Sequence, residues 1–200
     1  MTELQVLCKA AMSCTACDLS KQRTKVVPGD GSETTKVLFI GEAPGYYEDQ
    51  EGRPFVGAAG KLLTQLMGLA NLKREDVYIT NTVKCRPPGN RDPMPVEIAT
   101  CKSLWLDKQL ALIKPRIIVT LGRYSMAMFL PKETISKAHG LPRRVGDTLI
   151  YPIHHPAAAL HQQALRSTIE ADFKKLATVI RDLDKVQEEA VKPKQLNLFN

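Results

Sequence analysis

The sequence has no long apolar run. Its apolar stretches fall far short of the ~20 residues that a membrane-spanning helix needs, so we expect no membrane segment. Residues 1–14 lack a basic stretch followed by an uninterrupted apolar core, so we expect no signal peptide and a reducing, cytoplasmic environment. With 200 residues, 44% of them apolar and 24% charged, the chain is typical of a globular protein with a core of its own.

The glycine-rich loop after the first apolar run lacks the known phosphate-binding patterns. Residues 37–40 read VLFI, and several glycines follow in residues 41–60. Neither G-x-x-x-x-G-K-[ST] nor G-x-G-x-x-G occurs, and the loop has no lysine. Its acids, which would repel a phosphate, are Glu42, Glu48, Asp49 and Glu51. Two interpretations stay open: a site in which the Glu42 carboxylate directs a water at a carbon centre, or a tight turn with solvated acids.

Strands alternate with helices along the chain. Apolar runs predict strands at residues 37–40, 77–79, 116–121 and 148–153. Helical periodicity and stop signals predict helices at residues 61–70, 96–113, 123–130, 157–163 and 167–186. This order predicts an α/β fold with a parallel sheet and helices on both faces, whose site lies at the carboxyl ends of the strands. We expect one domain over residues 1–186 and a flexible tail over residues 187–200, where periodicity is lost.

The cysteines do not form the two close pairs of a usual zinc site. Cys14 and Cys17 form C-x-x-C, whereas Cys85 and Cys101 lie in a predicted loop and a predicted helix. Thiolates from three separate elements suit the corners of a cubane iron–sulfur cluster. A zinc site and ordinary free thiols stay open as alternatives. A thioredoxin-type motif is disfavoured because no strand precedes the C-x-x-C, and Cys8 has no assigned role.

Several side chains at the ends of predicted strands suit a flat heterocyclic ligand. The Asn81 amide can read adjacent C=O and N–H groups on a ring, and His155 can donate to an oxygen that gains charge. Phe55 can stack on such a ring, and Glu42 lies at the end of a neighbouring strand. Together these residues predict a pocket for a planar heterocycle.

The charge balance favours a polyanionic partner. The net charge is +7 and the isoelectric point is about 9.2. Basic residues near the Pro/Gly-rich loops are expected at the surface, where they could meet a phosphate backbone. These residues are Lys84, Arg86, Arg91, Arg143 and Arg144.

Six motifs carry a resemblance to a known family. They are CTAC (14–17), GEAPGYYEDQEGRPFVGAAGKLL (41–63), YITNTVKCRPPGNRDP (78–93), Cys101, PRIIVTLG (115–122) and HPAAAL (155–160). In this order they resemble the family 4 uracil-DNA glycosylases, the iron–sulfur type of bacteria and archaea. The resemblance implies a three-layer α/β/α fold with a four-stranded parallel sheet. It also implies a monofunctional enzyme of base-excision repair that hydrolyses the N-glycosidic bond of uracil in double- or single-stranded DNA and leaves an abasic site.

The resemblance also implies roles for individual residues. Cys14, Cys17, Cys85 and Cys101 would hold a structural 4Fe–4S cluster. Gly41, Glu42 and Ala43 would line the uracil pocket, with Phe55 stacked on the base, Asn81 at its Watson–Crick edge and His155 at O2. Glu42 and His155 would be the catalytic residues, and HPAAAL would enter the duplex. A tyrosine is common before the motif histidine, whereas His154 stands here, so which imidazole faces the base is open.

Three further expectations concern partners. Gln195 to Phe199, QLNLF, resembles the short bacterial motif that binds the sliding clamp, with apolar anchors on a tail. The enzyme is expected to act as a monomer at the nucleoid of the cytoplasm. Two rivals stay open: a superfamily relative that bonds covalently to uracil-DNA through a basic-histidine loop, for which residues 137–147 are the nearest segment, and a non-catalytic iron–sulfur module that binds nucleic acid.

Overall fold

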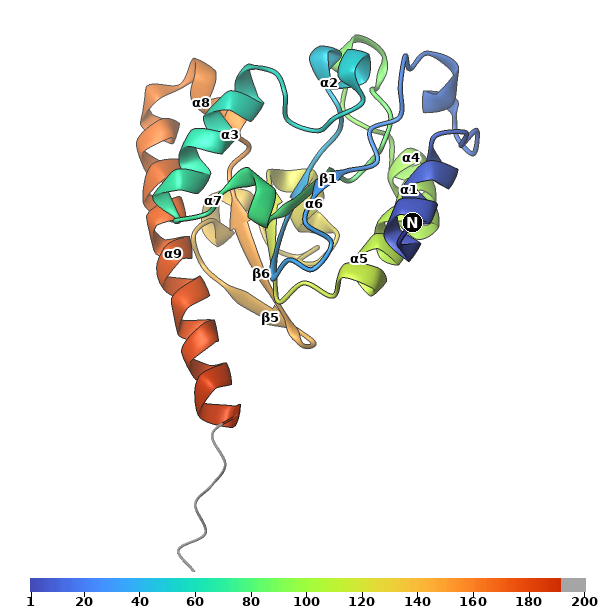
Figure 1. Ribbon diagram of the computed structural model, residues 1–200. Coiled ribbons are helices and arrows are strands. Elements are labelled where there is room, and N and C mark those ends of the chain that lie inside the picture. The colour runs from blue at the N-terminus through green and yellow to red at the C-terminus, as the bar shows by residue number, and fades with distance from the viewer. Residues whose placement is uncertain (192–200) are drawn as a thin grey trace, which may run out of the picture.

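A six-stranded sheet forms the centre of the molecule (Figure 1). This computed structural model describes residues 1–191, apart from the side chains of residues 161 and 184–191. The strand order is β1-β3-β2-β4-β6-β5. The bounds are β1 Asp30–Gly31, β2 Val37–Gly41, β3 Tyr78–Asn81, β4 Ile117–Leu121, β5 Arg143–Val145 and β6 Thr148–Ile153.

The expected four-stranded parallel sheet is wrong in the number of strands. Strands β3, β2, β4 and β6 are parallel neighbours and correspond to the four predicted strands. Two short antiparallel strands, β1 beside β3 and β5 beside β6, extend this sheet at its edges. Their sequences, DG and RRV, contain no apolar alternation, because short edge strands are held by pairing with a neighbour rather than by a buried face. The α/β class with helices on both faces is confirmed.

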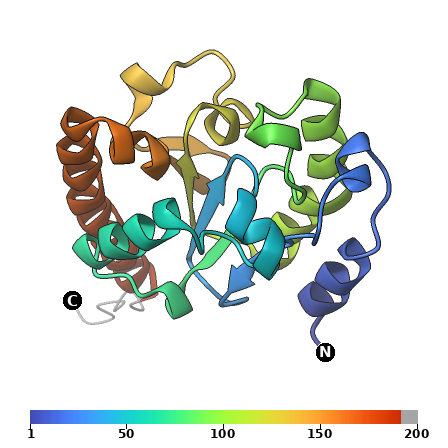
Figure 2. The same ribbon diagram turned by 90° about the horizontal axis from the view of Figure 1, so that it is seen from above.

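The helices cover both faces of the sheet (Figure 2). Their bounds are α1 Glu3–Ala11, α2 Tyr46–Glu51, α3 Ala58–Leu69, α4 Pro95–Cys101, α5 Asp107–Ile113, α6 Arg123–Ala127, α7 Ile135–Ala138, α8 Pro156–His161 and α9 Gln163–Val191. A π-helical segment, Lys102–Leu106, joins α4 to α5. Single 3₁₀ turns occur at Asp18–Lys21, Arg74–Asp76 and Pro88–Asn90.

Side chains from alternate strand positions form two separate core layers. Phe39 points to the face covered by α3 and α9, where its ring stacks on Phe173 at 6.2 Å. Leu38 and Ile40 point to the other face, where they pack with Leu4 of α1 and with residues of the α4–α5 helix. The period of two along β2 therefore places one helical layer on each face.

The predicted helices are largely confirmed, and three were missed. The helix expected over residues 96–113 is one continuous rod made of α4, the π segment and α5, which ends at Lys114 before Pro115. The helix expected over residues 167–186 begins earlier and continues to Val191.

Helices α1, α2 and α7 were not predicted. Helices α2 and α7 are short and carry few apolar residues. Helix α1 has apolar residues at helical spacing, Leu4, Leu7 and Ala11, after a Thr2 capping box, and sequence reasoning missed this signal.

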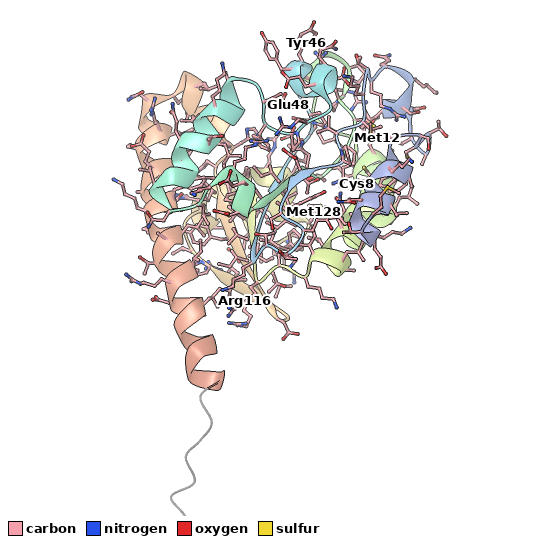
Figure 3. The ribbon with its side chains drawn as sticks, viewed as in Figure 1. Cys8, Met12, Tyr46, Glu48, Arg116 and Met128 are labelled. Atoms are coloured by element: carbon pink, nitrogen blue, oxygen red, sulfur yellow. The ribbon has the colours of Figure 1, made fainter. Side chains whose placement is uncertain are left out.

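The carboxyl ends of the parallel strands meet at one edge of the sheet. Gly41 of β2 pairs in register with Asn81 of β3, and β6 ends just before His154. Figure 3 shows Tyr46 and Glu48 at this end of the molecule and Arg116, just before β4, at the opposite end.

None of the described helices is both long enough and apolar enough to span a membrane. The segment from Gln195 to Phe199 lies outside the described residues.

Candidate functional site

A cavity of about 260 Å³ opens at the carboxyl ends of β2, β3 and β6. It brings together the predicted residues Glu42, Ala43, Phe55, Asn81 and His155. The other lining residues, which sequence reasoning did not single out for this pocket, are Pro44, Gly45, Glu48, Ala59, Pro87, Asn90, Arg91 and Ala157. The loop after β2, the loop after β3 and the start of α8 therefore form one pocket, as the position rule for parallel sheets predicts.

Gly41 holds the base of the pocket together although it does not line it. Its carbonyl accepts hydrogen bonds from the Thr82 backbone N–H at 2.9 Å and from the Thr82 hydroxyl at 3.0 Å. A Cβ atom at this position would overlap both Asn81 Oδ1 and the Phe55 ring. Glycine is therefore required so that these two side chains can converge over the end of β2.

Asn81 presents an unpaired acceptor to this region. Its side chain is 1% exposed, and its Oδ1 has no hydrogen-bond partner among the described residues. Buried polar atoms in folded proteins are nearly always paired, and an orphan atom costs about 1–3 kcal/mol. The amide is therefore poised for a ligand that donates a hydrogen bond.

Phe55 is held in an unusual backbone conformation. Its φ angle is 52°, which is uncommon for a bulky residue and is found where the surrounding structure enforces it. Arg74 donates from Nη1 to the Phe55 carbonyl at 3.1 Å and from Nη2 to the Pro54 carbonyl. Glu48 Oε1 accepts from the backbone N–H groups of Val56 and Gly57, both at 2.9 Å. These bonds fix the Phe55 ring, whose centroid lies 5.7 Å from that of His155.

The three acids whose role the sequence left open now have places. Glu48 clamps the backbone after Phe55, and Asp49, 2% exposed, accepts from the backbone N–H groups of Thr24 and Lys25. Glu51 is exposed. Glu48 and Asp49 therefore anchor the loop. The one sequence signal for this role is that both acids belong to a short acidic segment that follows a strand.

His155 is the pocket histidine, and the structure fixes its tautomer. It precedes α8, and its Nδ1 accepts from the Ala157 backbone N–H at 3.2 Å. Desolvation lowers the pKa of His155 to about 4, so the ring is neutral near pH 7. With Nδ1 as an acceptor, the proton lies on Nε2, which is then a neutral donor. Gly122, at φ 94°, leaves room for His155 against the end of β4.

His154 belongs to a different cluster. Its ring centroid lies 4.9 Å from that of His139, and His139 Nδ1 lies 2.8 Å from the buried Asp172 carboxylate. Burial lowers the pKa of His154, and His139 lowers it further. His154 is absent from the pocket lining, so the structure places His155 and not His154 at the pocket.

Glu42 is a half-buried carboxylate with charged neighbours. Burial raises the pKa of Glu42 above its ordinary value, Asp92 raises it further and Arg123 opposes this. Arg123 Nη2 donates to Asp92 at 2.7 Å, so the two neighbours form an ion pair of their own. The Glu42 carbonyl accepts from the Val83 backbone N–H at 3.2 Å, which keeps the loop after β2 beside the loop after β3.

The four predicted cluster ligands line a second cavity. Cys14 and Cys17 come from the loop after α1, Cys85 follows β3 and Cys101 ends α4. Three sulfur atoms receive N–H groups at 3.3 Å: Cys14 from Trp105 Nε1, Cys85 from Arg23 Nη1 and Cys101 from the Lys84 backbone. Trp105 lies in the π-helical segment, and such segments are frequent at functional sites. Sequence reasoning missed Trp105 and Arg23.

The cysteine cavity offers the donor set of a thiolate metal centre. Burial raises the pKa of Cys17, Cys101 and Cys85, the last to about 11. All three are therefore protonated thiols near pH 7 unless a metal ion displaces the proton from the sulfur. Among the described residues, no three Cys, His, Asp or Glu side chains are close enough to share one ion. Four cysteine sulfur atoms line the cavity, and such a set can hold a 4Fe–4S cluster or a zinc ion.

Of the five basic residues expected at the surface, four arginines are exposed or partly exposed and Lys84 is buried. Arg91 and Arg144 are exposed, and Arg86 lies over the exposed Tyr46 ring at 5.1 Å near the mouth of the pocket. The surface position expected for Lys84 is wrong, because Lys84 is only 1% exposed. Lys84 lies three residues after the buried end of β3 and lines the cysteine cavity, so its side chain points inward.

Comparison with known proteins places this architecture in one family. The fold and the pocket define an α/β protein with an aromatic-lined site at the ends of parallel strands. The sequence profile described as "Uracil DNA glycosylase superfamily" matches residues 28–183, and the chain belongs to this family.

Relatives narrow the placement to one branch. The "Type-4 uracil-DNA glycosylase" of Sulfurisphaera tokodaii is 46% identical over 186 residues, which cover 88% of this chain and 84% of the relative. The protein of that name from Archaeoglobus fulgidus is 46% identical, with 88% of this chain and 92% of the relative covered. The one from Thermotoga maritima is 41% identical, with 89% and 95% covered. The predicted resemblance to family 4 is confirmed.

Proposed function

We propose that the protein is a uracil-DNA glycosylase of base-excision repair. The observation that carries this proposal is the buried, unpaired Asn81 Oδ1 in a region shared with Phe55 and His155. Uracil offers an N3–H donor beside an O4 acceptor, which match the oxygen and nitrogen of one amide. Cytosine lacks the N3–H and carries an amine in place of O4, so the same amide rejects it.

The pocket residues divide the chemistry between the two halves of the breaking bond. DNA must first expose the uracil, which costs a few kcal/mol of unstacking. Bond cleavage leaves positive charge on the sugar and negative charge on the base. The Glu42 carboxylate stabilises the sugar and orients a water, whereas the neutral His155 donates from Nε2 to uracil O2 as charge develops there. Phe55 stacks on the ring. Ala43 lines the pocket, and Gly41 lets the Asn81 and Phe55 side chains converge there.

The cofactor of this proposal is a 4Fe–4S cluster held by Cys14, Cys17, Cys85 and Cys101. When bound, it supplies cross-linking of three separate chain segments rather than a reaction step. The N–H groups of Trp105, Arg23 and Lys84 support it, because such hydrogen bonds stabilise thiolate ligands. The cluster therefore fixes the loop after β3, which also carries one wall of the uracil pocket.

The remaining partners follow from the substrate. The exposed arginines and the net charge of +7 favour a polyanion such as DNA. The substrate is proposed to be double- or single-stranded DNA that contains uracil, at the nucleoid of the cytoplasm. The active form is proposed to be a monomer. The tail from Gln195 to Phe199 is proposed to bind the sliding clamp; unchanged clamp binding after deletion of residues 193–200 would contradict this.

The direct test is uracil release from a U:G duplex under single-turnover conditions. We expect free uracil from the wild type, and a loss of about 10²–10³-fold for His155→Ala, since one such donor is worth that much. Glu42→Ala should lose a comparable amount. Near wild-type rates for both variants would sink the assignment. An adduct with DNA that survives SDS would identify the covalent relative instead, and DNA binding without uracil release would identify a non-catalytic module.

The base-reading role has its own test. Asn81→Asp presents a carboxylic acid that can pair with cytosine, so it should release cytosine from a C:G or C:A duplex at a measurable rate. Wild-type protein at the same concentration is the control and should release none. Absence of any gain with intact uracil release would contradict the edge-reading role of Asn81.

A further inference from the structure

Lys84 is a buried cation with no anionic partner among the described residues. Its side chain is 1% exposed, and its Nζ donates to the Thr80 hydroxyl at 2.6 Å and to the Asn81 carbonyl at 2.8 Å. Both acceptors are neutral. Buried charges in proteins are nearly always paired, because an unpaired one costs several kcal/mol of desolvation. A carboxylate is missing where one is expected.

The cysteine cavity, which Lys84 lines, is where a negative charge would come from when a cluster is bound. Lys84 lines the cysteine cavity, and its backbone N–H donates to Cys101 Sγ at 3.3 Å. In the described part of the chain, the cavity is lined by two basic side chains, Arg23 and Lys84, and by no carboxylate. Four thiolates outweigh the positive charge of an iron–sulfide core, so the loaded cluster is an anion.

The contacts of Lys84 also reach the uracil pocket. Asn81, whose carbonyl accepts from Nζ, carries the unpaired amide of that pocket. The Thr80 hydroxyl, which accepts from Lys84 Nζ, donates in turn to the Pro28 carbonyl at 2.8 Å. The Lys84 carbonyl accepts from the Val27 N–H at 2.8 Å, which fixes the lysine itself. One side chain therefore connects the cysteine cavity to the base-reading residue.

We propose that Lys84 is the buried counter-cation of the iron–sulfur cluster and that it holds the base-reading Asn81 in position from the cluster side. This inference rests on the proposed cofactor and goes beyond it, because it assigns a role to a residue that binds neither iron nor uracil. Lys84 is a positioning residue. The rival explanation is a neutral strut, in which only the two hydrogen bonds of Nζ matter and the charge does not.

The first measurement is the reduction equilibrium of the cluster in the intact, iron-loaded protein. Lys84→Met keeps the length of the side chain and removes its charge. A nearby cation stabilises the more negative, reduced cluster, so its loss should lower the equilibrium constant for reduction by about tenfold or more. For one electron, tenfold equals about 59 mV toward lower potential. A redox titration followed by electron paramagnetic resonance measures this shift.

The matched control is Lys102→Met. Lys102 directly follows the ligand Cys101, but it is partly exposed and pairs with Asp107 at 2.7 Å. Its removal should leave the potential nearly unchanged. Equal potentials for wild type, Lys84→Met and Lys102→Met would overturn the counter-cation role. If Lys84→Met is isolated without its cluster, the iron content of Lys84→Arg decides: retention of iron supports the charge role, and equal loss of iron from both variants overturns it.

The second measurement is the affinity for free uracil, followed by product inhibition. Loss of the bond to the Asn81 carbonyl should weaken uracil binding several-fold in Lys84→Met and leave Lys102→Met unchanged. Unchanged uracil inhibition in a Lys84→Met protein with full iron would overturn the coupling to Asn81. A wild-type protein without iron and sulfide would overturn the cofactor and this inference together, whereas uracil release tests the glycosylase assignment separately.

Discussion

The two cavities of this protein lie at opposite ends of the same short segment, residues 81–85, and differ in how their polar groups are satisfied. The uracil pocket keeps an acceptor of Asn81 unpaired and a proton on His155 Nε2. At the cysteine cavity, N–H groups already point at three of the four sulfur atoms. A site for a transient ligand leaves its hydrogen-bonding groups free, whereas a site for a permanent group surrounds its ligands with donors.

This contrast predicts that damage at the cysteine cavity reaches the whole molecule, whereas damage at the pocket is confined to the reaction. Cys85→Ala should have the largest effect, with loss of the brown iron–sulfur absorption near 400 nm and of cooperative folding. Iron analysis and thermal unfolding measure both. Cys8→Ala is the control, because the Cys8 thiol is hydrogen-bonded to Tyr78 and Gln109 and does not line the cysteine cavity, so this variant should keep the cluster. A Cys85→Ala variant that is colourless yet stable and active would contradict the prediction that damage at the cysteine cavity affects the whole molecule.

Gly41→Ala should damage the pocket and spare the cluster. The added methyl group would overlap Asn81 Oδ1 and the Phe55 ring, and displacement of reacting groups by about 1 Å can cost on the order of 10²-fold in rate. Single-turnover uracil release and iron content are the measurements. In the control Gly68→Ala, the methyl group meets no atom within 4 Å, so helix α3 should gain about 0.5–1 kcal/mol with full activity. A fully active Gly41→Ala would contradict the convergence of Asn81 and Phe55.

Arg74→Met tests the strained support of the stacking ring. It removes the donors to the Phe55 and Pro54 carbonyls, so Phe55 should lose its fixed position. Hydrogen bonds from a charged group are worth about 1.5–3 kcal/mol, which predicts a rise of about tenfold or more in KM with a smaller change in kcat.

The control for this prediction is Arg53→Met. Arg53 pairs with Asp30, which also lies 4.0 Å from Arg74, but among the described residues it makes no hydrogen bond to the Phe55 segment. Steady-state kinetics should show no change for Arg53→Met and partial rescue by Arg74→Lys. Equal effects of Arg53→Met and Arg74→Met would point to the Asp30 ion pairs instead of the Phe55 support.

The smallest effect concerns the pH profile. The pKa of Glu42 is raised by burial and by Asp92, so activity should fall as pH decreases through this raised value and the carboxylate becomes protonated. His155, with its pKa lowered to about 4, stays neutral over most of this range. Asp92→Asn removes a negative neighbour and should move the acidic limb of kcat/KM to lower pH by less than about one unit, because water screens the pair. Glu51→Gln, an exposed acid, should leave the limb in place; a limb that does not move in Asp92→Asn would assign it to another group.

The sequence predicted the four parallel strands and the site at their carboxyl ends because buried strands and loop glycines leave local patterns. It did not predict the edge strands, since Asp30–Gly31 and Arg143–Val145 are held by their neighbours and not by their own side chains. It also predicted Lys84 at the surface, because charged side chains are mostly exposed. Lys84 is buried instead, since the fold provides hydrogen-bond acceptors for its ammonium group. Arg74 and Trp105 lie outside the recognised motifs and act on residues 19 and 91 positions away.

The sequence by itself determined the family, the ligand types and the order of the elements, because these follow from residue identities and short-range spacing. Only the tertiary structure decided which of two adjacent histidines faces the pocket, how Phe55 is held and where the charge of Lys84 lies. Each of these depends on groups far apart in the chain: His139 and Asp172 take His154, Arg74 and Glu48 hold Phe55, and the cysteine cavity surrounds Lys84. Desolvation and hydrogen bonding act through space, so their outcome becomes visible only once the chain has folded.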